Sequence, residues 1–479
     1  MLLVACSRGT PPAATQPSNT VENVLLITID SLRADHVGAY GDAEAHTPAL
    51  DALAAGGVRF DRAYASTPLT LPSHTSLLTG RYPPHHGVRT DAGHLGEAVP
   101  TLAETFRHGG FATAAFPAAT PLDGRSGLAR GFESYATVKR DLFEGRPATE
   151  VPERVVVDAA DWLETHAHRR FFMWVHVFAP HVPYGNPGDR ARAARPAIDR
   201  YDDEVMQADA QVGRLLAALG PGRRNTLIVV TADHGEAFGE HGEITHGLFV
   251  YDATLRVPLI LNGPAIARGR VISDPVSLVD VAPTLVALAG LGRFDADGVA
   301  VLPTKEETPS APRNPRLIYS ESYAPLADFG WSPLRSARRG DWKYIAAPEP
   351  ELYDVRSDPG ETRNLVEDQP ARATELAHEI DTMAPLDATG GPARPDPKDR
   401  REIAARLAEV TSGELQGPLL ERALREIIRD DPGNGVANLR LAELLAGSRR
   451  CKEAVKRFRL AVAAHAPGAD TSASRARCQ

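Results

Sequence analysis

Three apolar runs of the sequence end in side chains that can bind a metal ion. "ENVLLITID" ends at Asp30, and "RFFMWVHVFAPHVPY" carries His181 just beyond its apolar part. "RNTLIVVTADHGE" ends in Asp233 and His234. Ligands of parallel α/β sheets bind at the carboxyl ends of strands, so these ends should meet. A lone Asp most often caps a helix and a lone His often only packs, but the set together predicts a metal site.

A fourth segment, "LTLPSHTSLLTG", supplies a hydroxyl group. Thr70 stands directly before an expected helix, with Pro72 near the first turn, where its missing N–H costs nothing. The free N–H groups of a helix N-terminus attract anions. Beside a cation held by Asp30, Asp233 and His234, the hydroxyl of Thr70 could lose its proton and become a nucleophile at neutral pH. The alternative is that Thr70 only caps the helix.

The loop after the Asp-His pair adds a further imidazole. In "GEHGEITHGLF", His241 and His246 each precede a glycine. One His in a glycine-rich loop is a weak signal. His246 is nevertheless expected to reach the same sheet edge, where it could donate to a substrate oxygen or to a leaving group.

The order of elements along the chain fits a sheet that gathers these residues. Residues 1–20 form a polar tether, and residues 21–387 alternate short β-branched runs with amphipathic helical stretches, which predicts an α/β domain. Residues 388–400 are a linker rich in Pro, Gly and charge. Residues 401–479 are expected to be all-helical, with similar helix ends about one tetratricopeptide period apart. We therefore predict a tetratricopeptide-like module there, with a generic helical tail as the alternative.

The cysteines bear on location and on cross-linking. Leu3-Val4-Ala5-Cys6 has the form of a bacterial lipobox, although the segment before it is too short for a complete signal peptide. We expect an exported periplasmic or cell-envelope lipoprotein anchored through Cys6, or a cytoplasmic protein if the lipobox is spurious. Cys451 and Cys478 could pair or stay free.

Charge and hydropathy limit the partners. The net charge of −9 argues against nucleic acid. The sequence lacks an apolar run of about 18 residues, so we expect contact with a membrane only through a lipid anchor. The helical module suggests a protein partner or self-association.

Residues 22 to about 385 resemble a sulfatase-family hydrolase of the alkaline phosphatase superfamily. The matching segments, in order, are "NVLLITIDSLRADHVGAYG", "HTPALDALAAGGVRFDRAYA", "TLPSHTSLLTGRYPPHHGV", "TLAETFRHGGFATAAF", "WVHVFAPHVPY", "TADHGEAFGEHGEITHG", "SLVDVAPTLVALAGL" and "ELYDVRSDPGETRNL". The resemblance implies an α/β, alkaline-phosphatase-like sulfatase fold with a central mixed, mostly parallel sheet flanked by helices. The all-α C-terminal region is similar to tetratricopeptide extensions of some members.

The resemblance also implies an ester hydrolase with one divalent metal ion and an anionic ester substrate, either a small molecule or one linked to a glycan or lipid. The metal ligands that it implies are Asp30, Thr70, Asp233 and His234. Thr70 would be the nucleophile, with His181 and His246 in catalytic roles. The residues implied to bind the substrate are His74, His181, His246 and Asp91. Arg33 and Tyr184 lie in matching motifs, but we assign them no role.

The sequence departs from the sulfatase pattern at several of these positions. Sulfatases carry Cys or Ser in a Cys/Ser-x-Pro-x-Arg motif and convert it to formylglycine. Here the run is "TLPSH", so Thr70 cannot follow that route and His74 replaces the Arg. Ser31 stands in place of an acid, and His234 in place of an Asn.

These departures favour chemistry at phosphorus. A formylglycine hydrate can expel sulfate by breaking its own C–O bond, whereas a modified Thr needs water or an acceptor to attack at phosphorus or sulfur. We therefore expect hydrolysis or transfer at a phosphate ester through a phospho-Thr70 intermediate. A His ligand moves the preference toward Mn²⁺ or Zn²⁺, with Ca²⁺ less favoured.

Two alternatives stay open. The first is a sulfatase that acts on sulfate esters without formylglycine. The second, of another class, is a catalytically weak binding scaffold with a helical docking module. The metal content of the protein separates the scaffold from either enzyme.

Overall fold

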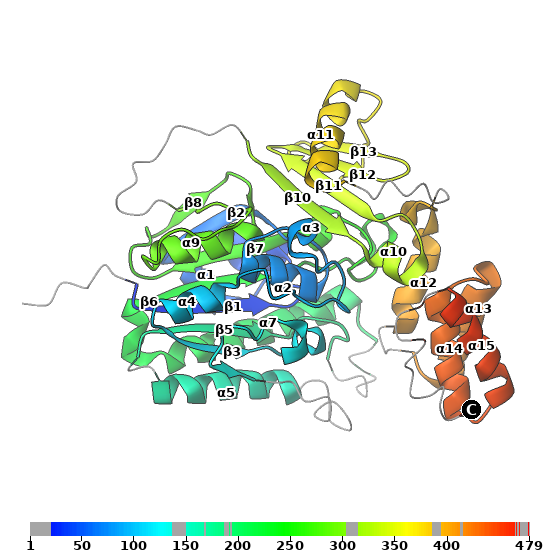
Figure 1. The fold of residues 1–479 in the computed structure, drawn as a ribbon, viewed down its shortest axis with the longest axis horizontal. Helices are drawn as coiled ribbons and strands as arrows, with labels where there is room; N and C mark the ends of the chain where they lie inside the picture. Colours follow the sequence, from blue (N-terminus) through cyan, green and yellow to red (C-terminus); the bar gives the residue numbers. More distant parts are fainter. Residues whose placement is uncertain are drawn as a thin grey trace, which may run out of the picture.

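The computed structural model describes residues 21–136, 150–166, 169–185, 191, 194–302, 315–385, 394–411, 415–464, 466, 469 and 478. The predicted tether with Cys6 and residues 388–393 of the predicted linker lie outside these residues. The described chain forms a large sheet with helices on both faces, a smaller sheet and a group of C-terminal helices (Figure 1).

The large sheet has nine strands and is mixed but mostly parallel. Eight strands follow the order β4-β3-β5-β1-β6-β7-β2-β8, and β9 pairs with β2. Only β7 runs antiparallel to its partners within this sheet of the described chain. The strands are β1 (Asn23–Ile29), β2 (Val58–Tyr64), β3 (Ala112–Phe116), β4 (Ser134–Tyr135), β5 (Phe171–Val177), β6 (Thr226–Ala232), β7 (Arg256–Asn262), β8 (Arg270–Ile272) and β9 (Val276–Ser277). The predicted α/β class and sheet type are confirmed.

The three central strands are continuous apolar runs because both faces of the sheet are covered. Every residue of β1, β5 and β6 is buried. Strand β1 lies between the other two in parallel register, with Ile29 opposite both Val177 and Ala232. The three carboxyl ends therefore lie at one edge, where the sequence predicts the metal site.

Helices pack on both faces of the large sheet. The helices α1 (Pro48–Ala55), α5 (Glu150–His166) and α7 (Ala197–Ala218) contact one another in series. Another set of mutual contacts joins α2 (Thr70–Thr79), α4 (Leu102–His108) and α9 (Val281–Leu288), with α3 (Pro83–His86) beside α2. All ten residues of α2 are buried, and α2 ends at Gly80, whose φ of 66° suits glycine.

The smaller sheet is antiparallel and carries one long helix. Its order is β10-β11-β12-β13. Its elements are β10 (Leu317–Ser322), β11 (Leu334–Arg339), β12 (Trp342–Ala346), β13 (Glu351–Asp354) and the helix α11 (Pro370–Met383). The short helices α8 (Asp252–Leu255) and α10 (Ala324–Phe329) lie in connections.

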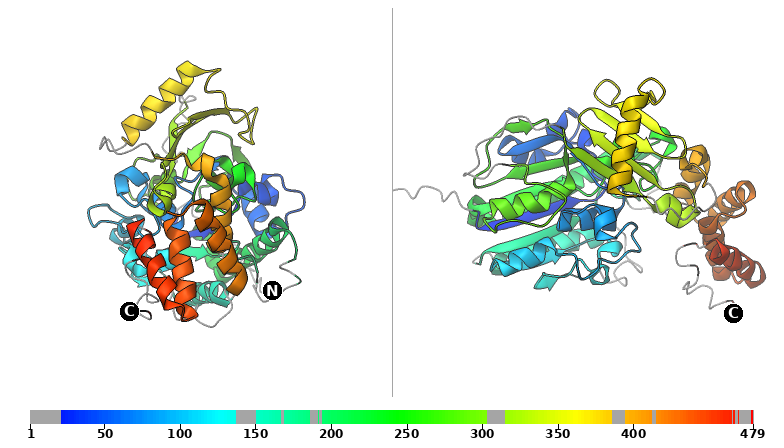
Figure 2. Two further views of the ribbon diagram at one scale, coloured as in Figure 1. Left: turned by 90° about the vertical axis from the view of Figure 1, so that its right-hand side faces the viewer. Right: turned by 45° about the horizontal axis from the view of Figure 1, so that its top comes forward.

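Four helices follow: α12 (Arg401–Thr411), α13 (Gly417–Asp430), α14 (Gly435–Gly447) and α15 (Cys451–Ala463). They gather at one end of the molecule and face the viewer in the left view of Figure 2. Leu441, Leu445 and Phe458 are buried between them. A disulfide joins Cys451 to Cys478, a pairing that the sequence left open. Their identity as a tetratricopeptide-like module stays a prediction.

These C-terminal helices pack on the α/β part. Trp331 shares their apolar cluster, and Phe329 of α10 and Leu248 pack against it. Helix α12 contacts the short helical turn η7 (Glu240–Gly242), where Arg401 lies beside Gly242. The helices therefore touch the same loop that carries His246. None of the described helices is long and apolar enough to cross a membrane.

Candidate active site

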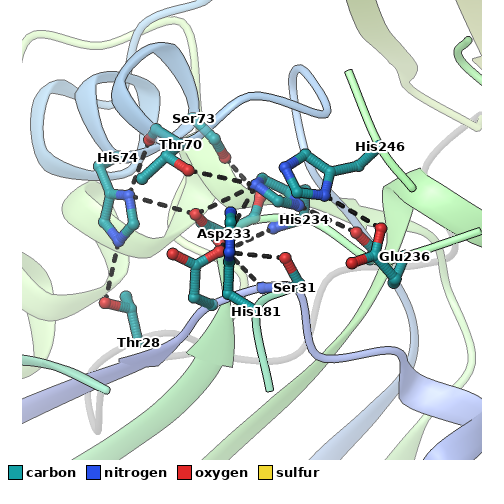
Figure 3. A network of polar contacts seen from close by, with 12 residues as sticks. Thr28, Ser31, Thr70, Ser73, His74, His181, Asp233, His234, Glu236 and His246 are labelled. Carbon is teal, nitrogen blue, oxygen red and sulfur yellow. Dashed lines mark hydrogen bonds and ion pairs between the residues drawn. The ribbon is translucent and has the colours of Figure 1, made fainter. Parts of the chain in front are cut away.

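Two strand ends bring three ligand side chains together. Asp30 follows β1, and Asp233 and His234 follow β6; all three are fully buried. One ligand atom from each lies within 4.8 Å of the others, so the three could share one ion. Ser31, the residue after Asp30, has a φ of 59° and donates its N–H to Asp233 Oδ1 at 3.2 Å. This bond ties the turn after β1 to Asp233, which lies beside Ser31 and His234 in Figure 3.

The residues present fit a cation. Asp30 Oδ2 and Asp233 Oδ2 are buried, and each lacks a hydrogen-bond partner among the described residues. Burial, and then the charge of Asp30, raise the pKa of Asp233 well above its ordinary value. Burial would also raise the pKa of Asp30, but His181, His176 and His234 together lower it. Two buried carboxylates at one point are costly unless a positive charge lies between them.

His234 presents a lone pair to that same point. Its Nδ1–H donates to the carbonyl of Gly235 at 2.9 Å, which leaves Nε2 as the unprotonated nitrogen. Nε2 lies 3.4 Å from Asp233 Oδ2 and 3.4 Å from Thr70 Oγ1. Burial, and then the charge of His246, hold the pKa of His234 well below its ordinary value. The ring is therefore neutral, which is the form that binds metals.

Thr70 is the first residue of α2 and the member of this group with exposed surface, at 5%. It lies at a helix N-terminus, where Leu69 provides no side-chain cap. Asp91, an exposed residue, accepts the next N–H, that of Leu71, at 2.8 Å. Ser73 donates its hydroxyl to the carbonyl of Asp233 at 2.5 Å, which ties the first turn of α2 to β6. The predicted nucleophile thus reaches the predicted ligands.

His246 is held as a cation by Glu236. Its Nδ1–H donates to Glu236 Oε1 at 3.0 Å, and the hydroxyl of Tyr184 donates to Oε2 at 2.9 Å. Burial would lower the pKa of His246, but Glu236, with lesser contributions from Asp30 and Glu243, raises it to about 9. The ring lies 4.2 Å from that of His234. Nε2–H can therefore serve a substrate oxygen.

His181 lies beside His246, on the loop that follows β5. The two rings are 5.1 Å apart in a T-shaped arrangement, and His181 also stacks on Phe178 at 4.8 Å. Its Nδ1–H donates to the carbonyl of Val182 at 2.5 Å. The predicted pair of catalytic imidazoles is therefore brought together beside His234 of the ligand triad.

His74 has a different environment from the one its predicted role requires. It is fully buried, with Nδ1 2.8 Å from the carbonyl of Thr70 and Nε2 3.0 Å from Thr28 Oγ1. Burial, and then the charge of His176, lower its pKa to about 3. Both ring nitrogens thus bond to protein atoms. Contact of His74 with a substrate stays a prediction that this geometry does not favour.

Sequence reasoning missed two residues of the site. His176, fully buried near the end of β5, has Nε2 3.3 Å from Asp30 Oδ2. The sequence offered only one indication of this role: His176 is the one polar residue in the otherwise apolar run "FFMWVHV". Glu236 lies four residues after β6, and no sequence pattern indicates its bond to His246, which crosses ten residues of loop.

Comparisons with known proteins identify the family of the chain. The family model described as "Sulfatase" matches residues 22–291, more than half of the chain. The model described as "N-sulphoglucosamine sulphohydrolase, C-terminal" matches residues 239–384.

Two curated relatives are similar over most of their length. An uncharacterized sulfatase of Escherichia coli K12 is 28% identical over 420 residues, which cover 72% of this chain and 83% of the relative. A Delta 4,5-hexuronate-2-O-sulfatase of Bacteroides thetaiotaomicron is 27% identical over 415 residues, covering 72% and 85%.

Solved structures share the fold. A 2-O GAG sulfatase has a TM-score of 0.64 at 24% identity, covering 79% of this chain and 96% of that chain. The phosphonate monoester hydrolase of Agrobacterium radiobacter has a TM-score of 0.62 at 23% identity, covering 75% and 95%. With its sheet, its buried ligand triad and these matches, the chain belongs to the sulfatase family, whose matched relatives are ester hydrolases of the alkaline-phosphatase-like fold.

Proposed function

We propose that this protein hydrolyses, or transfers from, phosphate esters through a covalent intermediate on Thr70. The observation that carries the proposal is the nucleophile position itself. The hydroxyl of Thr70 lies 3.4 Å from Nε2 of His234, at the mouth of the ligand triad. Because a Thr cannot be converted to formylglycine by the sulfatase route, its ester must be cleaved at phosphorus or sulfur.

The steps follow from the placement of two side chains. Thr70 Oγ1, having lost its proton, attacks phosphorus in line with the bond to the leaving alcohol, and that P–O bond breaks. His246 gives its Nε2 proton to the leaving oxygen. Water then attacks the phospho-Thr70, His246 takes a proton from it, and the P–Oγ1 bond breaks to restore Thr70. His181 would donate to an equatorial oxygen.

Asp30, Thr70, Asp233 and His234 would hold one divalent cation. When bound, it supplies the Lewis acidity that lowers the pKa of the Thr70 hydroxyl and neutralises charge on the phosphoryl oxygens. A donor set with an imidazole nitrogen favours Mn²⁺ or Zn²⁺, although the three oxygens also admit Ca²⁺. Asp91, an exposed residue that accepts the N–H of Leu71, is proposed to contact the part of the substrate that leaves.

The runner-up is hydrolysis of sulfate esters by the same residues. It is favoured by the curated relatives, which are named as sulfatases. Under either proposal the substrate is an anionic ester, carried on a small molecule, a glycan or a lipid.

The test uses the full chain beside Thr70→Ala, with bound metal measured first. Matched 4-nitrophenyl phosphate, bis(4-nitrophenyl) phosphate and 4-nitrophenyl sulfate are assayed with Mn²⁺, Zn²⁺ and Ca²⁺. We expect phosphoester turnover that is lost in Thr70→Ala, and a phosphorylated Thr70 peptide by mass spectrometry after acid quenching. Sulfate turnover alone would replace the proposal by its runner-up. A protein with no stoichiometric metal and no turnover would instead be the binding scaffold.

A further inference from the structure

A chain of three buried side chains leads from the centre of the sheet to the backbone of Thr70. Trp174 of β5, Thr28 of β1 and His74 of α2 are all fully buried. Trp174 Nε1 lies 3.0 Å from Thr28 Oγ1, which lies 3.0 Å from His74 Nε2. His74 Nδ1 lies 2.8 Å from the carbonyl oxygen of Thr70. We call Trp174, Thr28 and His74 the relay.

Each bond along the relay has one direction, because the groups at its two ends, the indole of Trp174 and the carbonyl of Thr70, can each play only one part. An indole N–H can only donate and a carbonyl oxygen can only accept. Trp174 therefore donates to Thr28, and His74 donates its Nδ1–H to Thr70. The hydroxyl of Thr28 can then donate its hydrogen to the unprotonated Nε2 of His74. The result is a continuous series of donors that ends at the backbone carbonyl of Thr70; Figure 3 shows its last two bonds, from Thr28 to His74 and from His74 to Thr70.

The neighbouring His176 has the opposite tautomer. Its Nδ1 accepts the N–H of Ala118 at 3.3 Å, so its proton lies on Nε2, which faces Asp30 Oδ2 at 3.3 Å. The nitrogens of His74 and His176 nearest the two carboxylates thus both carry hydrogens. His74, His176 and Asp233 come close enough to bind a second ion, but these tautomers make the two imidazoles donors rather than ligands.

We propose that Thr28 and His74 are positioning residues that fix the backbone of Thr70, so that its Oγ1 stays at the cation site. The orientation of a hydroxyl at a helix terminus depends on the backbone of its own residue. His74, the last member of the relay, holds the carbonyl of that backbone. Loss of partners one step removed from a metal ligand typically costs 10–100-fold in metal affinity or activity. The predicted effect on kcat rests on the proposed function, whereas the predicted effect on cation affinity does not.

The experiment removes the hydroxyl of Thr28 while keeping the size and shape of its side chain. Thr28→Val deletes the middle of the relay, Thr28→Ser retains the hydroxyl, and Thr113→Val is the matched control. Thr113 is also a fully buried strand threonine, but its hydroxyl bonds to the carbonyl of Gly131. The full chain is measured for kcat and KM with a 4-nitrophenyl ester, and for Mn²⁺ and Zn²⁺ affinity by competition with a chelator, without substrate.

We expect Thr28→Val to lower kcat by about 10-fold or more with KM nearly unchanged, and to weaken cation binding by about 3–10-fold. Thr28→Ser should return both to within about threefold of the wild type, and Thr113→Val should match the wild type. A second pair checks the other bond. In His74→Asn the side-chain amide can replace the Nδ1–H, whereas His74→Leu has no donor.

The possible results distinguish failure of the relay proposal from failure of the proposed function. Wild-type turnover and cation affinity in Thr28→Val would overturn the relay and leave the proposed function standing. A wild type without turnover, combined with weaker cation binding in Thr28→Val but not in Thr28→Ser, would overturn the proposed function and support the relay. A rise in KM alone in His74→Leu would mean that His74 contacts the substrate, which also overturns the proposal.

Discussion

Glu236→Gln should move the alkaline limit of catalysis to lower pH. The carboxylate of Glu236 lies 3.0 Å from His246 Nδ1 and is the main group that raises the pKa of His246 to about 9. The rise from the ordinary value of 6.5 corresponds to about 3 kcal/mol of preference for the imidazolium. Asp30 and Glu243 supply part of it, and Asp30 would be neutralised by a bound cation. The neutral amide of Gln should therefore lower the pKa of His246 by about one to two pH units.

The direction of the shift in the alkaline limit follows from the role of His246 as a proton donor. In the wild type the donor is protonated below pH about 9 and is lost as the pH rises through that value. In Glu236→Gln the loss should begin near neutral pH. Glu240→Gln is the matched control, because Glu240 lies on the same loop but pairs with Arg33.

The assay is the pH profile of kcat between pH 5 and about 10.5, with saturating cation and a substrate whose leaving group needs protonation. A 4-nitrophenol leaving group, which needs little protonation, should show a smaller change than an alkyl alcohol. If the alkaline limb stays in place in Glu236→Gln, His246 is not the group that gives up the proton. An equal shift in Glu240→Gln would attribute the effect to the loop as a whole.

Three further predictions concern the cation site and stability. Asp233→Asn should abolish cation binding, measured by metal content, yet raise the melting temperature of chelator-treated protein by a few degrees, because the raised pKa of Asp233 means that its ionisation costs stability as the pH rises. Unchanged melting would contradict the cost assigned to the paired carboxylates. Chelation of the wild type should lower its melting temperature, and Mn²⁺ or Zn²⁺ should restore it; calorimetry with and without each ion checks this. Cys451→Ser opens a link that spans 27 residues, and should cost the C-terminal helices about 2–4 kcal/mol, seen as faster proteolysis there while turnover is retained.

Positions fixed by sheet geometry were predictable from the sequence. Asp30 and Asp233 follow buried strands whose parallel register alone brings them to one edge, so an apolar run ending in a carboxylate was a sufficient signal. Thr70 was expected directly before a helix, whereas the structure begins α2 at Thr70 itself; the position of its side chain was predictable because the start of a helix fixes it.

Positions that depend on ring orientation were not predictable. His74 was expected at the substrate because it replaces an Arg of the motif, yet its ring bonds to Thr28, a residue 46 positions away. His176 was not predicted as a site residue, because nothing in "FFMWVHV" indicates which atoms its two ring nitrogens contact. Only the packed structure reveals such partners, because each depends on several elements at once.

The contact between the C-terminal helices and the loop that carries His246 has an energetic consequence. Leu248, two residues after His246, packs against the apolar cluster that α13 and α14 help to form. Arg401 of α12 lies beside Gly242, four residues before His246. The loop and the helices therefore share part of their free energy of folding. A molecule that binds these helices and alters their packing must change the stability of the loop, and a substrate that orders the loop must, by the same amount, change the affinity for that molecule.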